Sequence, residues 1–524
     1  MPEQGEEMRM QRPMRPQHRR PFQVLSGALI TALLCGPLLA AEPKRGGTLD
    51  VGLAQDPLVI DPIRTGSFTE RQFATPVYES LFRIDEQGAT VPFLAQSHTS
   101  SDDLATWRIE LREGIRFHDG TALDAEAVVA NLERTRDPAN RCRCLNQAQE
   151  IASVKAVDPH TVEIVLKDGN AALPTMLADA IGVMVSPTAF KASPETIGTH
   201  PVGTGPFKFV EWVRGSRFVA ERNPDYWQQG KPYLDRIVLR GIQNVVTNEA
   251  TFQSGQTDMI FQPSHRFSAL MKKNPKAVVL QPAGMGTDGI YMNTKAPPFD
   301  DVRVRRAVAY AMDRELLRKT LSFDIPTLAY SPFGAGLPVA QPTEVYPEFD
   351  LAKAKALVAE YGKPVRFEFQ VNNTPNNLQF AQSLQNMWKA AGIEARIQPL
   401  DQNRLVQNMT SKTFVASYFR WTGRADPHLN AYTFLHSKYA DEVPNSNYVG
   451  YGNPKVDELL DRGRQEADPA KRREIYAEMA RVLAQDVPIA YLFNVSDAIV
   501  TSPTVHGIDV VPDGLVYFDS VWKE

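Results

Sequence analysis

Residues 291–313 read YMNTKAPPFDDVRVRRAVAYAMD, and this stretch combines the two kinds of secondary structure on which the fold assignment rests. Its first residues continue an apolar run from Ile290, which favours a strand, and Pro297-Pro298 then mark a turn. Asp300-Asp301 predict a helix N-terminus, because acidic side chains are favoured there. Helical spacing predicts that this helix buries Val304, Val308, Ala311 and Leu316, with basic residues on its other face. The stretch therefore predicts a strand, a turn and a helix in succession.

The chain after this stretch repeats the alternation of helix and strand. Asp350 is placed to cap a helix, Gly392 to end one, and Pro469 to occupy a first helical position. The predicted helices cover 351–361, 377–392 and 469–484, and the strands that follow them cover 365–371, 393–399 and 489–493. Successive helix-then-strand units indicate an α/β domain.

Strand patterns dominate the chain before residue 290. Apolar and polar residues alternate in the predicted strands 46–53, 107–111 and 161–166. Between the last two, Thr121 and Asp124 have the spacing of a capping box with Asp in place of Glu, which predicts a helix to about Arg136. This part of the chain is expected to form a small α/β unit of its own.

The composition is that of an ordinary soluble globular protein, with 524 residues of which 43% are hydrophobic and 23% charged. The net charge of −4 provides no basic field for nucleic acid. The sequence contains no P-loop, Gly-x-Ser-x-Gly or His-Glu-x-x-His pattern. Gly284, Gly286 and Gly289 match a dinucleotide-binding fingerprint, but a predicted strand follows them where a helix would have to hold the pyrophosphate. We therefore predict no catalytic residue, no metal site and no cofactor.

The first 41 residues have the composition of a cleaved export signal. Five arginines precede an uncharged, mostly apolar run over 24–41, which Gly and Pro interrupt. Cys35 follows two leucines, so we interpret it as part of this run and not as a lipoprotein site. Arg19-Arg20 partly resembles a twin-arginine signal and leaves both the Sec and the Tat route open. The mature protein is expected in the periplasm.

Two further cysteines, Cys142 and Cys144, are separated by one residue. No His or second Cys pair stands near them at the spacing of a metal site. A local disulfide in an oxidising compartment and two inert thiols are the alternatives that the sequence leaves open.

Several long motifs resemble one known family. They are RFHDGT at 116–121, PVGTGPF at 201–207, RNPDYW at 222–227, PYLD at 232–235, the stretch 291–313 and YGNPKVD at 451–457. From Gly46 to the C-terminus, the chain resembles the extracytoplasmic solute-binding proteins of family 5, which serve peptide, nickel and opine ABC importers.

This resemblance implies an α/β protein with the two-lobed periplasmic-binding-protein fold (type II, cluster C) and an extra α/β subdomain in the first lobe. By analogy, residues 1–41 are a signal peptide, and the first lobe comprises 46–95, 201–285 and 495–524. The inserted subdomain would then be 96–200, and the second lobe 286–494.

The resemblance also implies a function: the substrate-binding component of an ABC importer, which captures a peptide or peptide-like solute in the periplasm. Its partners would be that solute and permease subunits in the inner membrane with a separate ATPase. We expect no enzyme activity and no nucleic-acid partner, and a monomer.

Dipeptide-binding relatives place an acidic residue directly after a Trp-Thr-Gly segment, where it pairs with the amine of the ligand. Here Trp421, Thr422 and Gly423 precede Arg424, and a cation cannot bind an ammonium group. Asp426 could replace the missing acid, or Arg424 could bind an anionic ligand in bidentate fashion. Equally, Arg424 could face solvent or pair with Asp426.

The same relatives carry an arginine for the ligand carboxylate in the loop that here reads NNTPN at 372–376, without arginine. The two changes predict a ligand other than a plain dipeptide: a longer peptide, or an anionic peptide-like or opine-like compound. Asn372 and Asn373 would offer uncharged hydrogen bonds or form a turn. Trp421 would offer a flat apolar surface or pack in the core, and Met285 would face the cleft.

Two other functions remain as alternatives. A secreted hydrolase could use scattered residues such as His118 and Asp119, although HDG at 118–120 has the composition of a turn. A periplasmic chaperone, or a protein that presents itself to a membrane sensor, could use the same fold.

Overall fold

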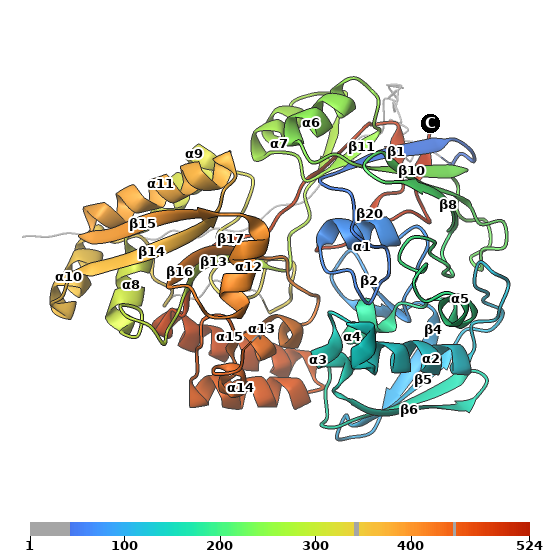
Figure 1. Ribbon diagram of the computed structural model, residues 1–524, viewed down its shortest axis with the longest axis horizontal. Helices are drawn as coiled ribbons and strands as arrows, with labels where there is room; N and C mark the ends of the chain where they lie inside the picture. The colour runs from blue at the N-terminus through green and yellow to red at the C-terminus, as the bar shows by residue number, and fades with distance from the viewer. Residues whose placement is uncertain (1–41, 340–344, 444–446) are drawn as a thin grey trace, which may run out of the picture. The chain divides into compact units, whose positions relative to one another are not determined.

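The computed structural model describes residues 42–339, 345–443 and 447–524, and the predicted export signal, with Cys35, lies outside them. The described chain forms three main sheets, of seven, five and four strands (Figure 1). We call the part built on the seven-stranded sheet the first lobe and the part built on the five-stranded sheet the second lobe. The part built on the four-stranded sheet is the inserted subdomain. The residues at which the chain passes from one part to the next remain a prediction.

The sheet of the first lobe is organised around β1 (Thr48–Leu53), a strand that the sequence predicted. Leu49, Val51 and Leu53 are fully buried, and β1 pairs in parallel with both of its neighbours. The strand order is β12 (Val278–Leu280), β18 (Ile499–Thr501), β11 (Met259–Phe261), β1, β10 (Arg236–Gly241), β9 (Arg217–Arg222) and β8 (Phe207–Val213). Helices α6 (Val245–Gln253) and α7 (His265–Met271) contact this sheet.

The sheet of the second lobe mixes parallel and antiparallel pairs. Its order is β15 (Ile393–Leu400), β14 (Val365–Asn372), β16 (Ala416–Trp421), β13 (Thr287–Met292) and β17 (Ile489–Asn494). The helices of this lobe are α8 (Val302–Tyr310), α9 (Arg314–Leu321), α10 (Leu351–Tyr361), α11 (Pro375–Ala390), α12 (Gln402–Thr410), α13 (Pro427–Leu435), α14 (Pro454–Gln465) and α15 (Pro469–Asp486). Trp388 of α11 is fully buried against Phe367 and Phe369 of β14, which fixes the helix on the sheet. The predicted helix-then-strand units are thereby confirmed.

Two helix positions in this lobe differ from the prediction. The helix after Asp301 stops at Tyr310, and Asp313 starts a separate helix by accepting a hydrogen bond from Leu316 N at 2.8 Å. The second helix has a new orientation, so Leu316 is 48% exposed and Leu317 is buried in its place. The prediction that Leu316 is buried is therefore wrong. Helix α11 begins at Pro375, two residues before the predicted Asn377, because Thr374 caps it.

The inserted subdomain pairs its strands in the order β4 (Ala95–Ser100), β5 (Thr106–Leu111), β7 (Thr161–Leu166) and β6 (Ile151–Asp158). Helix α2 (Ala125–Arg136) packs on this sheet, and its N-cap is Asp124 and not Thr121. Short helices complete the part: α3 (Leu145–Ala148), α4 (Leu173–Met176) and α5 (Pro187–Ala192). Cys142 and Cys144, just before α3, form a disulfide, which decides between the two alternatives that the sequence left open.

Two adjacent segments join the two lobes: 281–286, between β12 and β13, and 495–498, between β17 and β18. Val495 N donates to Gly286 O at 3.0 Å. Gly284 has φ +77°, and a Cβ there would lie 1.6 Å from Val495 O, so no other residue fits. Gly284, Gly286 and Gly289 are therefore needed because the backbone of a neighbouring segment lies too close for a side chain. A strand follows them, as predicted.

Short elements complete the first lobe. Helix α1 (Phe68–Ala74) begins with a capping box between Ser67 and Glu70. The short strands are β2 (Phe82–Ile84), β3 (Thr90–Pro92), β19 (Val505–His506), β20 (Asp509–Val510), β21 (Val516–Tyr517) and β22 (Trp522–Lys523). Among the described residues, no helix has the length and apolar character that crossing a bilayer requires.

Candidate ligand-binding site

A cavity of about 430 Å³ is lined by residues of all three parts of the molecule. Helix α1, residues 143–147 before and within α3, residues 175–183 and the turn 511–517 supply one side. The second lobe supplies the loop after β16 and one face of α13. Small-molecule sites typically enclose about 300 to 1,000 Å³, so this cavity has the size of a ligand site.

One ion pair in the cavity wall joins the two sides. Arg424 Nε of the second lobe lies 2.5 Å from Asp179 Oδ2 of the inserted subdomain. Asn430 holds the loop, since its Oδ1 accepts from Arg424 N at 2.9 Å. Burial alone would raise the pKa of Asp179, but the charges of Arg424 and Arg71 lower it below its ordinary value. Arg424 therefore faces the cavity, and its partner is neither Asp426 nor solvent.

Two further arginines line the opposite side. Arg71, in the last turn of α1, pairs through Nη1 with Asp513 Oδ2 at 2.7 Å. Its Nε and Nη2 are buried, and no described residue accepts a hydrogen bond from them. Arg83 on β2 pairs with Asp519 at 3.2 Å, and its guanidinium lies 3.9 Å from the centre of the Tyr517 ring. Arg71 thus has two buried donors that no described residue satisfies.

Glu79 is a buried acid in the same wall. Its carboxylate accepts hydrogen bonds from Tyr226 Oη at 2.6 Å, Trp227 Nε1 at 3.0 Å and Thr204 Oγ1 at 2.9 Å. Burial raises the pKa of Glu79 to about 7, although Arg83 and these three donors act in the opposite direction. Close to neutral pH, Glu79 is therefore only partly charged.

Trp421 and Met285 both line the cavity, and their contact with a ligand stays a prediction. The indole Nε1 of Trp421 donates to Asn430 Oδ1 at 2.9 Å, and its ring lies 4.7 Å from that of Phe434. The aromatic pair gives the cavity an apolar wall beside its charged groups. Met285, in the segment that joins the lobes, is 1% exposed.

The other predicted site residues do not line this cavity. Asp426 is 4% exposed and forms a bidentate pair with Arg472, with distances of 2.5 and 2.7 Å. It also caps α13, so its carboxylate is already satisfied and does not replace the missing acid. Gly423 has φ +82° and lies against the backbone of Met285. Thr422, beside it, and Asn372 and Asn373, at the end of β14, also lie outside the lining, and Asn372 donates to Gln402.

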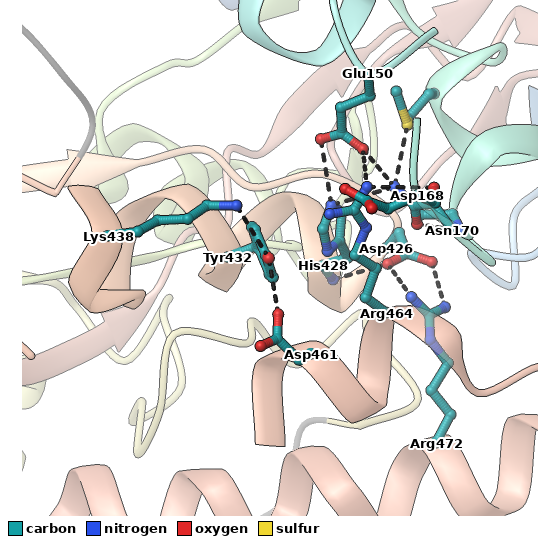
Figure 2. A network of polar contacts seen from close by, with 12 residues as sticks. Glu150, Asp168, Asn170, Asp426, His428, Tyr432, Lys438, Asp461, Arg464 and Arg472 are labelled. Atoms are coloured by element: carbon teal, nitrogen blue, oxygen red, sulfur yellow. Dashed lines mark hydrogen bonds and ion pairs between the residues drawn. The ribbon is translucent and has the colours of Figure 1, made fainter. Parts of the chain in front are cut away.

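A second set of contacts between the inserted subdomain and the second lobe lies outside the cavity lining (Figure 2). We call Glu150, Asn170, His428 and Arg464 the rim network. Glu150 Oε2 accepts from Asn170 Nδ2 at 2.9 Å and from Arg464 Nη2 at 3.1 Å, and Glu150 Oε1 lies 3.8 Å from His428 Nε2. Arg464 O also accepts from the backbone N of Ala171 at 2.9 Å.

The electrostatics of the rim network favour the ionised carboxylate of Glu150. Burial would raise its pKa, but His428 and Arg464 lower it below the ordinary value. The side chains of His428 and Arg464 are only 2% and 7% exposed. The network is therefore a buried set of polar groups joined across the junction, in which His428 Nδ1 and Arg464 Nε have no hydrogen-bond partner among the described residues.

His118 and Asp119, the residues considered for a hydrolase, do not line the cavity. His118 Nε2 lies 2.9 Å from the carbonyl oxygen of Gly205, and burial lowers the pKa of His118 to about 4. Asp119 accepts hydrogen bonds from Thr121 and Ser186. Both residues therefore hold a turn in place. Within the described residues, no group of His, Cys, Asp and Glu side chains is arranged to hold a metal ion.

Most of the charged groups in the cavity were not identified from the sequence. Arg71 and Asp513 are 442 positions apart, and no local pattern connects them. Arg143 stands between the two cysteines at 142–144, and no pattern in the sequence marks it as a cavity residue. Only the fold brings these residues together.

The family model for bacterial extracellular solute-binding proteins, family 5, matches residues 89–442. The glutathione-binding protein GsiB of Shigella dysenteriae serotype 1 is 30% identical over 499 residues, which cover 93% of this chain and 95% of GsiB.

Solved structures show the same fold. The periplasmic binding protein DppA from Helicobacter pylori, in complex with the peptide STSA, aligns with a TM-score of 0.81 and 22% identity over 92% of this chain and 99% of DppA. The oligopeptide-binding protein AppA from Bacillus subtilis, in complex with a nonapeptide, aligns with a TM-score of 0.80 and 23% identity over 92% of this chain and all of AppA. The chain therefore has the fold of periplasmic binding proteins of type II, cluster C.

Proposed function

Because the chain belongs to the bacterial extracellular solute-binding proteins of family 5, we propose that it captures a small acidic peptide in the periplasm and delivers it to an ABC permease. The binding of a solute for an ABC importer is the role of the family. We propose the ligand class, the periplasmic location, the monomeric state and the delivery of the ligand to a permease.

The excess of cations in the cavity carries the ligand assignment. Its arginines are Arg71, Arg83, Arg143 and Arg424, and its carboxylates are Glu79, Asp179 and Asp513, while Asp519, outside the lining, pairs with Arg83. Glu79 has a pKa of about 7 and so contributes less than a full negative charge at neutral pH. An anionic ligand would compensate this excess, and a guanidinium group in the cavity wall would give it charge-assisted hydrogen bonds.

The size of the cavity and the relatives favour a short peptide. About 430 Å³ suits a ligand of a few residues better than a long chain. Glutathione, after which the GsiB relatives are named, is a tripeptide with two carboxylates and one ammonium group, and its net charge fits the cavity. The apolar wall of Trp421 and Phe434 would contact its side chain.

Closure of the lobes would couple binding to transport. The ligand touches both lobes at once, so it binds the closed form more tightly and shifts the equilibrium towards that form. A permease that recognises the closed form would then receive loaded protein in preference to empty protein. The segments 281–286 and 495–498 are the short connections about which such a movement would take place.

Thermal unfolding of the mature protein tests this proposal. Glutathione added to ligand-free protein should raise the melting temperature, and by more than the net-neutral tetrapeptide Ser-Thr-Ser-Ala does at the same concentration. At 100 times its dissociation constant, a ligand adds about 2.7 kcal/mol to the free energy of unfolding. The matched comparison uses N-acetylated dipeptide amides, which carry no charge, at the same concentration. Stabilisation by the amides and not by glutathione would contradict the proposed ligand class.

A further inference from the structure

One arginine in the cavity wall differs from the other three. Arg71, Arg83 and Arg424 each pair with a carboxylate: Asp513, Asp519 and Asp179. Arg143 also lines the cavity, and within the described residues its guanidinium forms neither an ion pair nor a hydrogen bond. The wall thus contains one cation whose charge the protein itself does not balance.

The backbone around Arg143 is held on both sides. Its neighbours Cys142 and Cys144 are joined by a disulfide and are 6% and 8% exposed, within the core of the inserted subdomain. Arg143 N donates to Ile63 O at 2.9 Å, which ties the loop to the first lobe. Arg143 itself is exposed, so the buried disulfide presents its side chain outward.

Gly66 provides the space through which the side chain of Arg143 reaches the cavity. A Cβ at residue 66 would lie 2.5 Å from Arg143 Nη1 and 2.8 Å from Arg143 Cδ. A side chain at that position would displace the guanidinium of Arg143 from the place it occupies. The stem and the guanidinium of Arg143 therefore pass directly over the backbone of Gly66, which also lines the cavity.

We propose that Arg143, presented by the Cys142–Cys144 disulfide, is the anchor for a free carboxylate of the bound ligand and sets the preference for acidic solutes. This inference rests on the proposed function and assigns one of its contacts to a residue. A guanidinium presents paired N–H donors in a plane that matches the two oxygens of a carboxylate. The restrained loop reduces the freedom that Arg143 loses on binding.

The test compares two proteins with two pairs of ligands by isothermal titration calorimetry. The proteins are the wild type and Arg143→Gln. The ligand pairs are glutathione with glutathione diamide, and Ser-Thr-Ser-Ala with its C-terminal amide. The wild type should bind each acid about tenfold more tightly than its amide, as expected for one charge-assisted pair. Arg143→Gln should weaken the acids about tenfold and leave the amides within about twofold.

Two further variants separate charge from structure. Arg143→Lys keeps the charge without the planar pair of donors and should retain part of the preference. Arg141→Gln removes a neighbouring exposed arginine that does not line the cavity, and it should bind all four ligands like the wild type.

The possible outcomes distinguish the two proposals. Full preference for acids in Arg143→Gln, with an unchanged melting temperature, would overturn the role of Arg143. Equal binding of acids and amides by the wild type would overturn it as well, while solute binding itself would stand. A wild-type protein that binds none of the four ligands would overturn the proposed ligand class, and this inference with it.

Discussion

The second lobe meets the inserted subdomain at two places that differ in their chemistry. In the cavity wall, Arg424 pairs with Asp179, and their side chains remain 18% and 27% exposed. In the rim network, His428 and Arg464 are almost completely buried around Glu150. Arg424 and His428 are only four positions apart, on either side of the start of α13. One short segment therefore supplies a residue to each of the two contacts.

The difference suggests that closure and specificity are separated in this molecule. Groups of the rim network bind one another and do not line the cavity, so they can stabilise the lobe contact without touching a solute. Arg424 and Asp179 face the cavity, where a ligand can exchange with either partner. Changes in the rim network should therefore affect all ligands alike, whereas changes in the cavity wall should alter which ligand is preferred.

The largest effect is expected from Glu150→Gln. The substitution keeps the size of the side chain but leaves the buried charge of Arg464 without its carboxylate. Breaking a buried ion pair in this way typically costs about 3 to 4 kcal/mol. Urea unfolding of the variant should show this loss, and small-angle scattering of the ligand-free variant should show a larger radius of gyration.

Glu458→Gln on α14 is the matched control for Glu150→Gln. Glu458 pairs with Lys455 and Arg462 on the surface, and it is about half exposed. Surface pairs contribute little, so this variant should unfold like the wild type. If Glu150→Gln behaved like Glu458→Gln in both measurements, the rim network would have no part in closure.

A smaller effect, with a sign that distinguishes the two regions, is expected from pH. The pKa of Glu79 in the cavity wall is raised from 4.5 to about 7, so the folded protein holds a proton that the unfolded chain releases. Stability should fall by about 2 to 3 kcal/mol as pH rises from about 4.5 to about 7. Glu150 acts in the opposite direction: its pKa is lowered, so its contribution is present above pH 4.5 and is lost as pH falls through its folded-state pKa.

Unfolding free energies measured between pH 4 and 8 for the wild type and Glu79→Gln isolate the first contribution. The difference between the two curves should follow the ionisation of Glu79. A constant difference across this range would mean that Glu79 ionises in the folded protein as it does in the unfolded chain.

The sequence predicted local structure well because its signals are local. Asp350 caps α10, and the alternating strands β5 and β7 lie where they were expected. The sequence did not predict the break between α8 and α9. Asp313 fits the helical pattern that continues from α8, but it is also a good N-cap for a new helix. Only tertiary contacts select the N-cap.

The candidate site was predicted only in part, for a related reason. The position of Arg424 was identified through the motif around Trp421, but its partner Asp179 comes from another part of the chain, and so do the carboxylates of Arg71 and Arg83. Asp426 was a plausible ligand contact until Arg472 of α15 proved to occupy its carboxylate. Ion pairs between side chains of different helices and strands depend on the fold, and the spacing of residues in the sequence does not predict them.

The smallest and most specific effect on ligand affinity is expected when either member of the Arg424–Asp179 ion pair is replaced. Arg424→Ala leaves Asp179 available for an ammonium group of the ligand, whereas Asp179→Asn leaves Arg424 available for a carboxylate. The two variants should therefore change the ratio of affinities for glutathione and for glutathione diamide in opposite directions, each by about fivefold, or about 1 kcal/mol. Calorimetric titration of both variants with both ligands measures this ratio. Glu150→Gln should lower both affinities by the same factor and leave the ratio unchanged, because the rim network does not line the cavity. A ratio that moved in the same direction in both cavity variants would show that the ion pair acts only on closure, and the distinction between the two contacts would then disappear.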